Sequence, residues 1–188
     1  MTVKHKFQRV GVFIDVSNMY YSAKNLYNAY VNFGEVLKTA VAGRQLIRAF
    51  AYVIRAYIEP EKSFFEALEK QGFEVKVKDL QIFPGGMKKG DWDVGVCMDA
   101  ITMIQKLDVM VLVSGDGDYA DLLDYVRNEG VRTEVISFSR TTSGKLIAEA
   151  DEFLDMEKNP TRFLIKNRPS SSSRSASVPG APEPGPTA

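Results

Sequence analysis

The sequence has little of the chemistry on which many enzymes depend, because it holds one histidine, His5, and one cysteine, Cys97. A single cysteine excludes an intramolecular disulfide. A single histidine in a polar N-terminal stretch serves neither a Ser-His-Asp arrangement nor a His-rich zinc site. If the protein is an enzyme, we expect carboxylates, lysine, arginine or hydroxyl groups to carry its chemistry.

Two further absences concern charge and long apolar runs. The formal net charge is zero and the pI is about 6.6, whereas proteins that coat nucleic acid without specificity are usually basic. Any contact with nucleic acid is therefore expected to be local. No apolar run approaches roughly 18 residues and no secretory signal is evident, so we expect a cytoplasmic protein without a membrane partner.

The composition predicts one folded domain with two polar ends. Hydrophobic residues make up 45% of the 188 residues, which is enough for one sizeable core. We place an N-terminal lead at 1–6, the domain at 7–166 and a Ser/Pro-rich tail at 167–188. The tail is predicted to be disordered, because it has too little apolar surface to offset its ordering entropy. It is a candidate contact for a protein partner, and a homo-oligomer is left open.

Within the domain, strand-like and helix-like segments alternate. The strand-like runs are mostly continuous and apolar, which is typical of parallel sheets covered on both faces. The run at 73–83 alternates instead and indicates a strand nearer an edge. We expect strands at 9–16, 44–54, 73–83, 108–114 and 131–138, and helices at 17–30, 59–72, 91–107 and 118–130. The sequence therefore predicts an α/β fold with a mainly parallel central sheet.

Acidic residues follow two of these strands. Asp15 ends the first strand, and Asp116 comes just after the strand at 108–114. In open parallel sheets, ligands bind outside the carboxyl ends of the strands. If the two strands are neighbours, the carboxylates face each other and repel, unless a cation such as Mg²⁺ or Mn²⁺ neutralises them. Asp93, at the start of the helix at 91–107, is a candidate third ligand.

Ordinary helix-terminal roles compete with these assignments. Asp118 and Asp121 fit the start of a helix, where an acid caps the backbone or complements the helix dipole. Ser17 is a plausible N-cap for the helix at 17–30, which would leave Asp15 without a capping role. Asp99 lies about 240° around the helix from Asp93, so we leave it out of the site.

Several other polar and aromatic residues have two interpretations. Asn18 could orient a water or a phosphate, or simply start a helix. Lys88 and Lys89 lie in a glycine-rich loop before Asp93 and could contact a phosphate backbone, although such pairs are more often solvated surface. The same holds for Arg140 and Lys145. Four tyrosines fall at helical positions, where a core or interface role is the simpler reading and base stacking the alternative: Tyr20, Tyr21, Tyr27 and Tyr30.

Four segments in order resemble a known family. They are FIDVSN (13–18), KGDWDVGVCMDA (89–100), VLVSGDGDYADLL (111–123) and AEADEFLDM (148–156). Together they resemble the NYN domain family, in its LabA-like branch of the PIN-like nuclease superfamily. The resemblance implies a Rossmann-like three-layer α/β/α fold with a central, mainly parallel sheet. It also implies a metal-dependent ribonuclease site that uses Mg²⁺ or Mn²⁺ and acts on RNA, most simply single-stranded RNA.

The resemblance assigns roles residue by residue. The acids of the family fall on Asp15, Asp93, Asp116 and Asp118, which it implies are both metal ligands and catalytic residues. The family's Asn and Ser fall on Asn18 and Ser114, for which we expect substrate contacts, together with Lys89 on a phosphate. The superfamily often carries a further acid on an early helix, and Glu35 is the nearest candidate.

Two other functions remain open. A haloacid-dehalogenase-like phosphatase also has an acid after its first strand and a later Gly-Asp. Such a phosphatase normally has a second Asp two positions after the first, however, and Ser17 stands there. A non-catalytic module could bind RNA or protein through the same crevice, but such a module has no need of mutually repelling acids.

Overall fold

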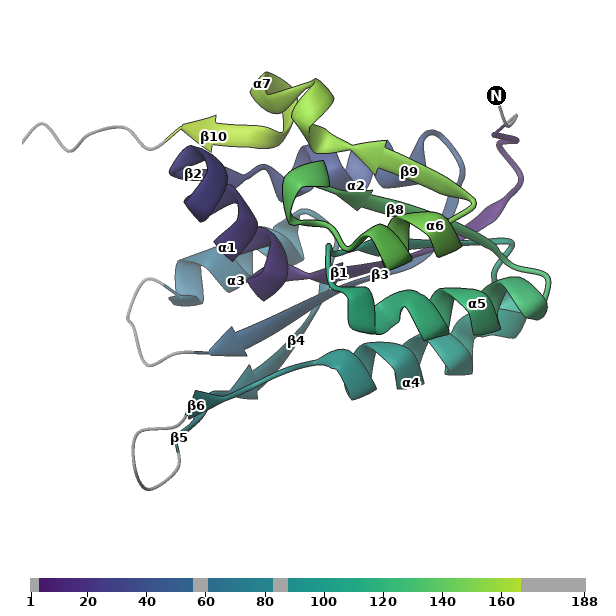
Figure 1. The fold of residues 1–188 in the computed structure, drawn as a ribbon, viewed down its shortest axis with the longest axis horizontal. Helices are drawn as coiled ribbons and strands as arrows, with labels where there is room; N and C mark the ends of the chain where they lie inside the picture. The colour runs from purple at the N-terminus through teal and green to yellow at the C-terminus, as the bar shows by residue number, and fades with distance from the viewer. Residues whose placement is uncertain (1–3, 56–60, 83–87, 167–188) are drawn as a thin grey trace, which may run out of the picture.

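A six-stranded parallel sheet forms the centre of the molecule (Figure 1). The computed structural model describes residues 4–55, 61–82 and 88–166, so the predicted tail at 167–188 lies outside the described residues. From one edge to the other, the strands are β4 (Glu74–Asp79), β3 (Gln45–Arg55), β1 (Arg9–Asp15), β7 (Val109–Val113), β8 (Arg132–Ser137) and β9 (Glu152–Asp155). All five pairings are parallel, and the predicted edge position of the alternating strand is confirmed.

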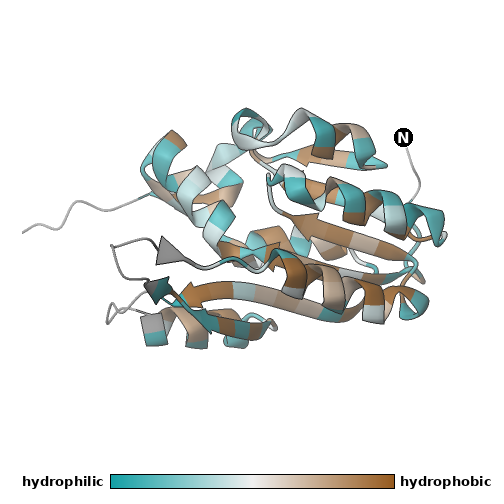
Figure 2. Ribbon diagram, turned by 60° about the horizontal axis from the view of Figure 1, so that its bottom comes forward, coloured by the Kyte–Doolittle hydropathy of each residue, from teal (hydrophilic) through white to brown (hydrophobic). Residues whose placement is uncertain are grey.

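Helices cover both faces of this sheet, as the three-layer prediction requires. On β1, Val12 and Ile14 point to one face and Phe13 to the other, as strand geometry demands. The first face packs against α1 (Val16–Tyr27), α2 (Phe33–Val41) and α3 (Glu61–Lys70). The second packs against α4 (Asp93–Met103), α5 (Ala120–Asn128) and α6 (Gly144–Glu149). The apolar strands lie between the two layers of helices (Figure 2).

The structure corrects the predicted helix at 17–30 at both ends. It begins at Val16 and ends at Tyr27, where Asn28 adopts a left-handed conformation with φ 47°. The next residues form β2 (Ala29–Val31), which pairs antiparallel with β10 (Leu164–Lys166). The hydrogen bonds of β2 thus come from a strand more than a hundred residues away in the sequence. The local sequence around 29–31 does not predict this pairing.

Other predicted elements divide into shorter pieces. The strand at 73–83 is interrupted at Leu80, after which β5 (Gln81–Ile82) pairs with β6 (Lys88–Lys89). The helix at 91–107 ends in a 3₁₀ turn, Ile104–Lys106, and the helix at 118–130 begins with another, Gly117–Tyr119. The strand β9 and the helices α6 and α7 (Pro160–Phe163) were not predicted. Across the described parts of the chain, no helix is long and apolar enough to cross a membrane.

Candidate active site

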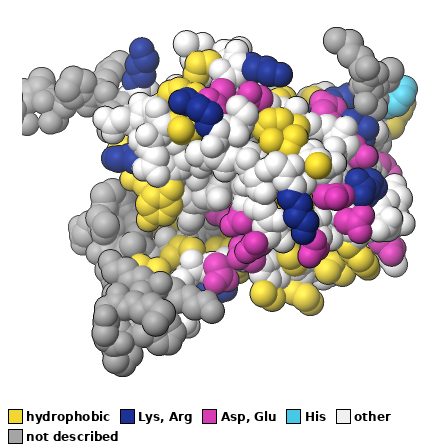
Figure 3. Space-filling view, in the orientation of Figure 1, with side chains coloured by type: hydrophobic (Ala, Val, Ile, Leu, Met, Phe, Trp, Pro, Cys, Tyr) yellow, Lys and Arg dark blue, Asp and Glu magenta, His cyan; other side chains and the backbone are white. Residues whose placement is uncertain are grey.

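The carboxyl ends of β1 and β7 lie side by side. The two strands pair in parallel, with Ile14 opposite Val113. Asp15 ends β1, and the loop after β7 carries Ser114 to Asp116, so these residues meet at one edge of the sheet, as the sequence predicted. Figure 3 shows acidic side chains gathered on this face, in the region where Figure 1 places the starts of α4 and α5.

Asp15 also caps the first helix. Its Oδ1 accepts a hydrogen bond of 2.9 Å from the backbone N–H of Asn18, and its backbone is extended, as an N-cap requires. The expectation that Ser17 would be the N-cap is therefore wrong, because α1 begins one residue earlier, at Val16. Capping uses one carboxylate oxygen of Asp15, and the other faces the side chains described next.

The hydroxyl group of Tyr119 lies between two of the predicted acids. It is 3.0 Å from Oδ1 of Asp93 and 3.4 Å from Oδ2 of Asp15. The Tyr119 side chain is fully buried in the core beneath α4 and α5. Sequence reasoning missed this residue, because a tyrosine at the start of a helix reads as ordinary core. Its position in the 3₁₀ turn after β7 is what brings the hydroxyl to both acids.

Burial and mutual repulsion raise the pKa values of these acids. Burial is the largest cause for Asp15, whose pKa rises to about 6. The hydrogen bond from Asn18 opposes this rise, while the charges of Asp93 and Asp116 add to it. Burial likewise raises the pKa of Asp93, and the hydrogen bond from Tyr119 lowers it. Burial and the carboxylates raise the pKa of Tyr119 far above its ordinary value, so its hydroxyl stays protonated.

The loop after β7 is tied to α1 and to itself. Oδ1 of Asn18 accepts a hydrogen bond of 2.9 Å from the backbone N–H of Gly115. The buried Ser114 hydroxyl accepts from the N–H of Asp116 at 3.2 Å, and Oδ1 of Asp116 accepts from the N–H of Asp118 at 3.0 Å. These bonds fix the direction in which the Asp116 side chain leaves the loop. Asp116, not Asp118, provides the cap of the following turn.

Comparisons with known proteins agree with this geometry. The NYN domain model matches residues 9–157. The chain belongs to the NYN domain family. It is 23% identical over 173 residues to the Low amplitude and bright protein LabA of Synechococcus elongatus, covering 84% of this chain and 88% of that one. A crystal structure of a protein of unknown function from Vibrio parahaemolyticus is 30% identical, covers 87% of this chain and all of its own, and has a TM-score of 0.78.

A weaker match involves a much larger protein. The Cysteine repeat modular protein A of Toxoplasma gondii is 26% identical over 137 residues, which is 71% of this chain but 4% of that protein. The NYN domain assignment therefore rests on the family match, and the solved structure supports the fold.

The side chains of this NYN domain are of the kind that hold a hard divalent cation. Mg²⁺ and Mn²⁺ prefer carboxylate oxygens. The charges of Asp93 and Asp116 act on Asp15, and the charge of Asp116 acts on Asp93. As the side chains stand in the described residues, no three acidic, histidine or cysteine side chains are close enough together to hold an ion. The donor chemistry thus fits, and the carboxylates would have to close in on a cation.

Asp118 lies at the margin of this cluster. It is exposed and lines a hollow of about 500 Å³ together with Gly117, Asp121, Ser143 and Lys145. Asp121 occupies the first turn of α5 and pairs with Lys145 at 2.7 Å. The charge of Asp118 raises the pKa of Asp93, so Asp118 is close enough for its charge to act on that acid.

The structure separates other candidates from the site. Asp99 accepts hydrogen bonds from Tyr52 and Lys76 on the sheet face. Glu35 pairs with Arg162 at 3.0 Å on the outside of α2. The backbone of Lys89 lies in β6, and its side chain lies outside what the structure describes.

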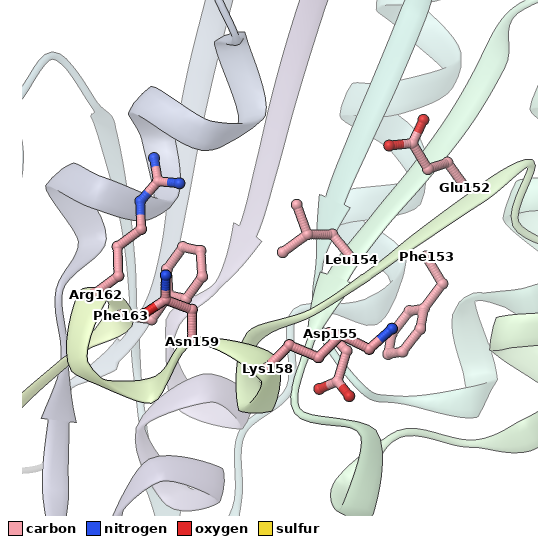
Figure 4. Close-up of a pocket in the computed structure, with 8 residues that line it drawn as sticks. All are labelled: Glu152, Phe153, Leu154, Asp155, Lys158, Asn159, Arg162 and Phe163. Carbon is pink, nitrogen blue, oxygen red and sulfur yellow. The ribbon is translucent and has the colours of Figure 1, made fainter. Parts of the chain in front are cut away.

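A second hollow, of about 300 Å³, lies along β9 and α7 (Figure 4). None of the residues predicted for the site lines it. Its walls carry Glu152, Phe153, Leu154, Asp155, Lys158, Asn159, Arg162 and Phe163.

Proposed function

We propose that this NYN domain is a metal-dependent ribonuclease that hydrolyses phosphodiester bonds of RNA. Family membership supports a nuclease-type, RNA-related role. The observation that carries the proposal is the placement of Asp15 and Asp93 around the Tyr119 hydroxyl, with the charge of Asp116 acting on both. A binding surface gains nothing from acids that raise one another's pKa, whereas a cation site depends on them.

In this proposal, Asp15, Asp93 and Asp116, with help from Asp118, would hold one or two Mg²⁺ or Mn²⁺ ions, which would supply an activated water and stabilise the charge that develops on a phosphodiester. Groups of the chain itself orient Asp15 and favour the ionised form of Asp93. The N–H of Asn18 fixes the direction of Asp15, and the protonated Tyr119 hydroxyl donates to Asp93 and favours its ionised form.

Two predicted substrate contacts take more specific roles. The side-chain oxygen of Asn18 is used by Gly115, which leaves the amide nitrogen for a phosphate or a water. Ser114 is fully buried, so we propose that it acts by positioning Asp116 through the N–H of that residue. Lys89 remains a proposed phosphate contact.

The decisive experiment measures cleavage of an end-labelled single-stranded RNA with Mn²⁺, with excess EDTA, and with Asp116→Asn. Asp124→Asn is the matched control, because Asp124 is an exposed acid of α5 that pairs with Arg127 away from the site. We expect metal-dependent cleavage by the native chain and the control, and none by Asp116→Asn. RNA binding without cleavage in Mn²⁺ would contradict the proposal and favour the binding module. A small aryl phosphate tests the phosphatase in parallel.

A further inference from the structure

Three tyrosines form an exposed aromatic cluster on α1, the helix that Asp15 caps, and on β2, which follows it. We propose that Tyr20, Tyr21 and Tyr30 stack on unpaired bases of a single RNA strand and lead that strand to the carboxylates. This inference rests on the proposed function, because it names the form in which that site takes its substrate.

The cluster is unlike the other tyrosines of α1 and of the core. Tyr20, Tyr21 and Tyr30 expose 37%, 63% and 41% of their surface. The ring centroids of Tyr20 and Tyr21 are 5.4 Å apart with an edge-on geometry, and those of Tyr20 and Tyr30 are 6.2 Å apart. The rings thus hold one another in place while leaving surface open to a ligand.

The fourth tyrosine of this region has another role. Tyr27 packs against Phe138, donates a hydrogen bond to Glu157 and accepts one from Arg140. Core and polar contacts therefore account for Tyr27, as the simpler sequence interpretation held. They do not account for the three exposed rings, which contact one another and, at Tyr30, Lys24.

The position of the cluster follows from helix geometry. Tyr20 and Tyr21 follow Asp15 by five and six residues on the same helix. At about 1.5 Å of rise and 100° of rotation per residue, they stand roughly 8 to 9 Å along the axis from the capping carboxylate and roughly 140° and 240° around it. Figure 1 shows α1 starting beside the region where α5 begins and running away from it towards β2. We infer that a single strand reaches both by passing around the start of α1, with bases on the rings and its backbone at the carboxylates.

The charge beside the rings suits nucleic acid. The ammonium group of Lys24 lies 5.9 Å from the centre of the Tyr30 ring. Among the described residues, Lys24 forms no ion pair, whereas Arg140 is paired with Glu157. Aromatic rings that accept bases, with a nearby cation for the backbone, are the usual means of binding single strands without sequence preference. Because the chain has no net charge, its contact with nucleic acid is expected to be local. The three rings and Lys24 form such a local surface.

The experiment measures binding in a chain that does not cleave. The full chain carrying Asp116→Asn is titrated into a fluorescently labelled oligouridylate in EDTA, and anisotropy gives the Kd. We expect Tyr21→Ala and Tyr20→Ala each to weaken binding by about tenfold, and the Phe variants to keep it, because stacking needs the ring. Lys24→Gln should reduce the salt dependence by about one counterion.

Two controls make the result specific. Tyr125→Ala removes a tyrosine of similar exposure, 43%, from α5, and should leave the Kd unchanged. The same oligonucleotide annealed to its complement has no free bases, so its binding should not respond to the Tyr20 and Tyr21 changes. Equal effects at Tyr125, or Ala variants that bind the single strand as tightly as the parent chain, would overturn the inference.

The two proposals fail in different ways. If the tyrosine variants lose binding but the native chain never cleaves RNA in Mn²⁺, the proposed function is wrong and the stacking surface stands. If the native chain cleaves and Tyr20 and Tyr21 have no effect on binding, only the stacking surface is wrong. Failure of the parent chain to bind the oligonucleotide, or a change of sedimenting mass in the Ala variants without a change in RNA affinity, also overturns the inference and points to a protein contact.

Discussion

The hydroxyl group of Tyr119 lies 3.0 Å from Oδ1 of Asp93, and this contact joins the loop after β7 to the first residue of α4. The contact matters because it opposes the effect of burial. Burial raises the pKa of Asp93, and the donated hydrogen bond lowers it. A fully buried hydroxyl group thus favours the ionised form of a candidate ligand.

Replacing Tyr119 with Phe should keep the ring in the core and remove this hydrogen bond. We expect the pKa values of Asp93 and Asp15 to rise, so the acid limb of the pH–cleavage profile should move to higher pH. Thermal denaturation should show a loss of about 1–3 kcal/mol, the usual cost of removing a buried partner of a charged group. Tyr52→Phe is the matched control, because Tyr52 donates to Asp99 outside the site; it should affect stability without moving the profile.

Ionisation of Asp15 should destabilise the metal-free fold. The folded chain holds this proton up to about pH 6, against an ordinary pKa of 3.8. Between these values the folded state binds more protons than the unfolded state, so stability falls as pH rises through the window. Asp15→Asn keeps an N-cap oxygen and removes the charge. We expect it to stabilise the EDTA-treated protein at pH 7 by about 1–3 kcal/mol, with no gain below about pH 4.

Asp108 provides a control, because the pKa of this acid is shifted in the direction opposite to that of Asp15. Hydrogen bonds from Arg9 lower the pKa of Asp108, so its charge stabilises the fold at neutral pH and this stabilisation is lost as pH falls through the lowered value. Asp108→Asn should therefore lower the free energy of unfolding at pH 7, and urea titrations of both variants at pH 4 and pH 7 measure the two effects. If Asp15→Asn and Asp108→Asn both lower the free energy of unfolding at pH 7, the charge of Asp15 does not destabilise the fold.

Added Mn²⁺ or Mg²⁺ should raise the Tm of the native chain. A ligand that binds only the folded state stabilises it by mass action, and here it would also relieve the repulsion among Asp15, Asp93 and Asp116. The rise should be larger at pH 7 than at pH 5, where Asp15 is mostly protonated. Differential scanning fluorimetry measures this, and EDTA should reverse it. An equal rise in Asp116→Asn and in Asp124→Asn would locate the ion elsewhere.

Gly115 should tolerate no side chain. An added Cβ would lie 2.6 Å from the carbonyl oxygen of Thr141, which is backbone and cannot move aside easily. Gly115→Ala should therefore displace the Asp116 loop, lower stability by about 1–3 kcal/mol, and reduce cleavage. Gly144→Ala is the control, since nothing lies within 4 Å of its added Cβ, and it should be close to neutral. Melting curves and cleavage rates for the pair test this.

The sequence predicted the centre of the sheet better than its margins. The strands β1 and β7 are continuous apolar runs, and their burial on both faces follows from that composition. The strand β9 has four half-buried residues, and β2 is only three residues long, so neither carries a pattern that the sequence alone reveals. Their partners, β8 and β10, are what make them strands.

The site was predictable in part for the same reason. The acids Asp15 and Asp116 follow apolar strands, and parallel pairing places such strand ends together. The capping role of Asp15 was not predictable, because Ser17 fits an N-cap equally well by type. Nor was Tyr119, whose hydroxyl reaches its partners only because the turn after β7 packs beneath α4.

The hydrogen bond from Gly115 to Asn18 joins positions 97 residues apart. Asn18 and Gly115 come together only when β1 pairs with β7. The chain between these two strands includes β3 and β4. Closing so long a loop is slow and entropically costly, and the apolar strand contacts must provide the driving force. A growing chain that has not yet made β7 therefore carries Asp15 without Asp116, one of its repelling partners. Asp15 and Asp116 meet only after β1 and β7 have paired.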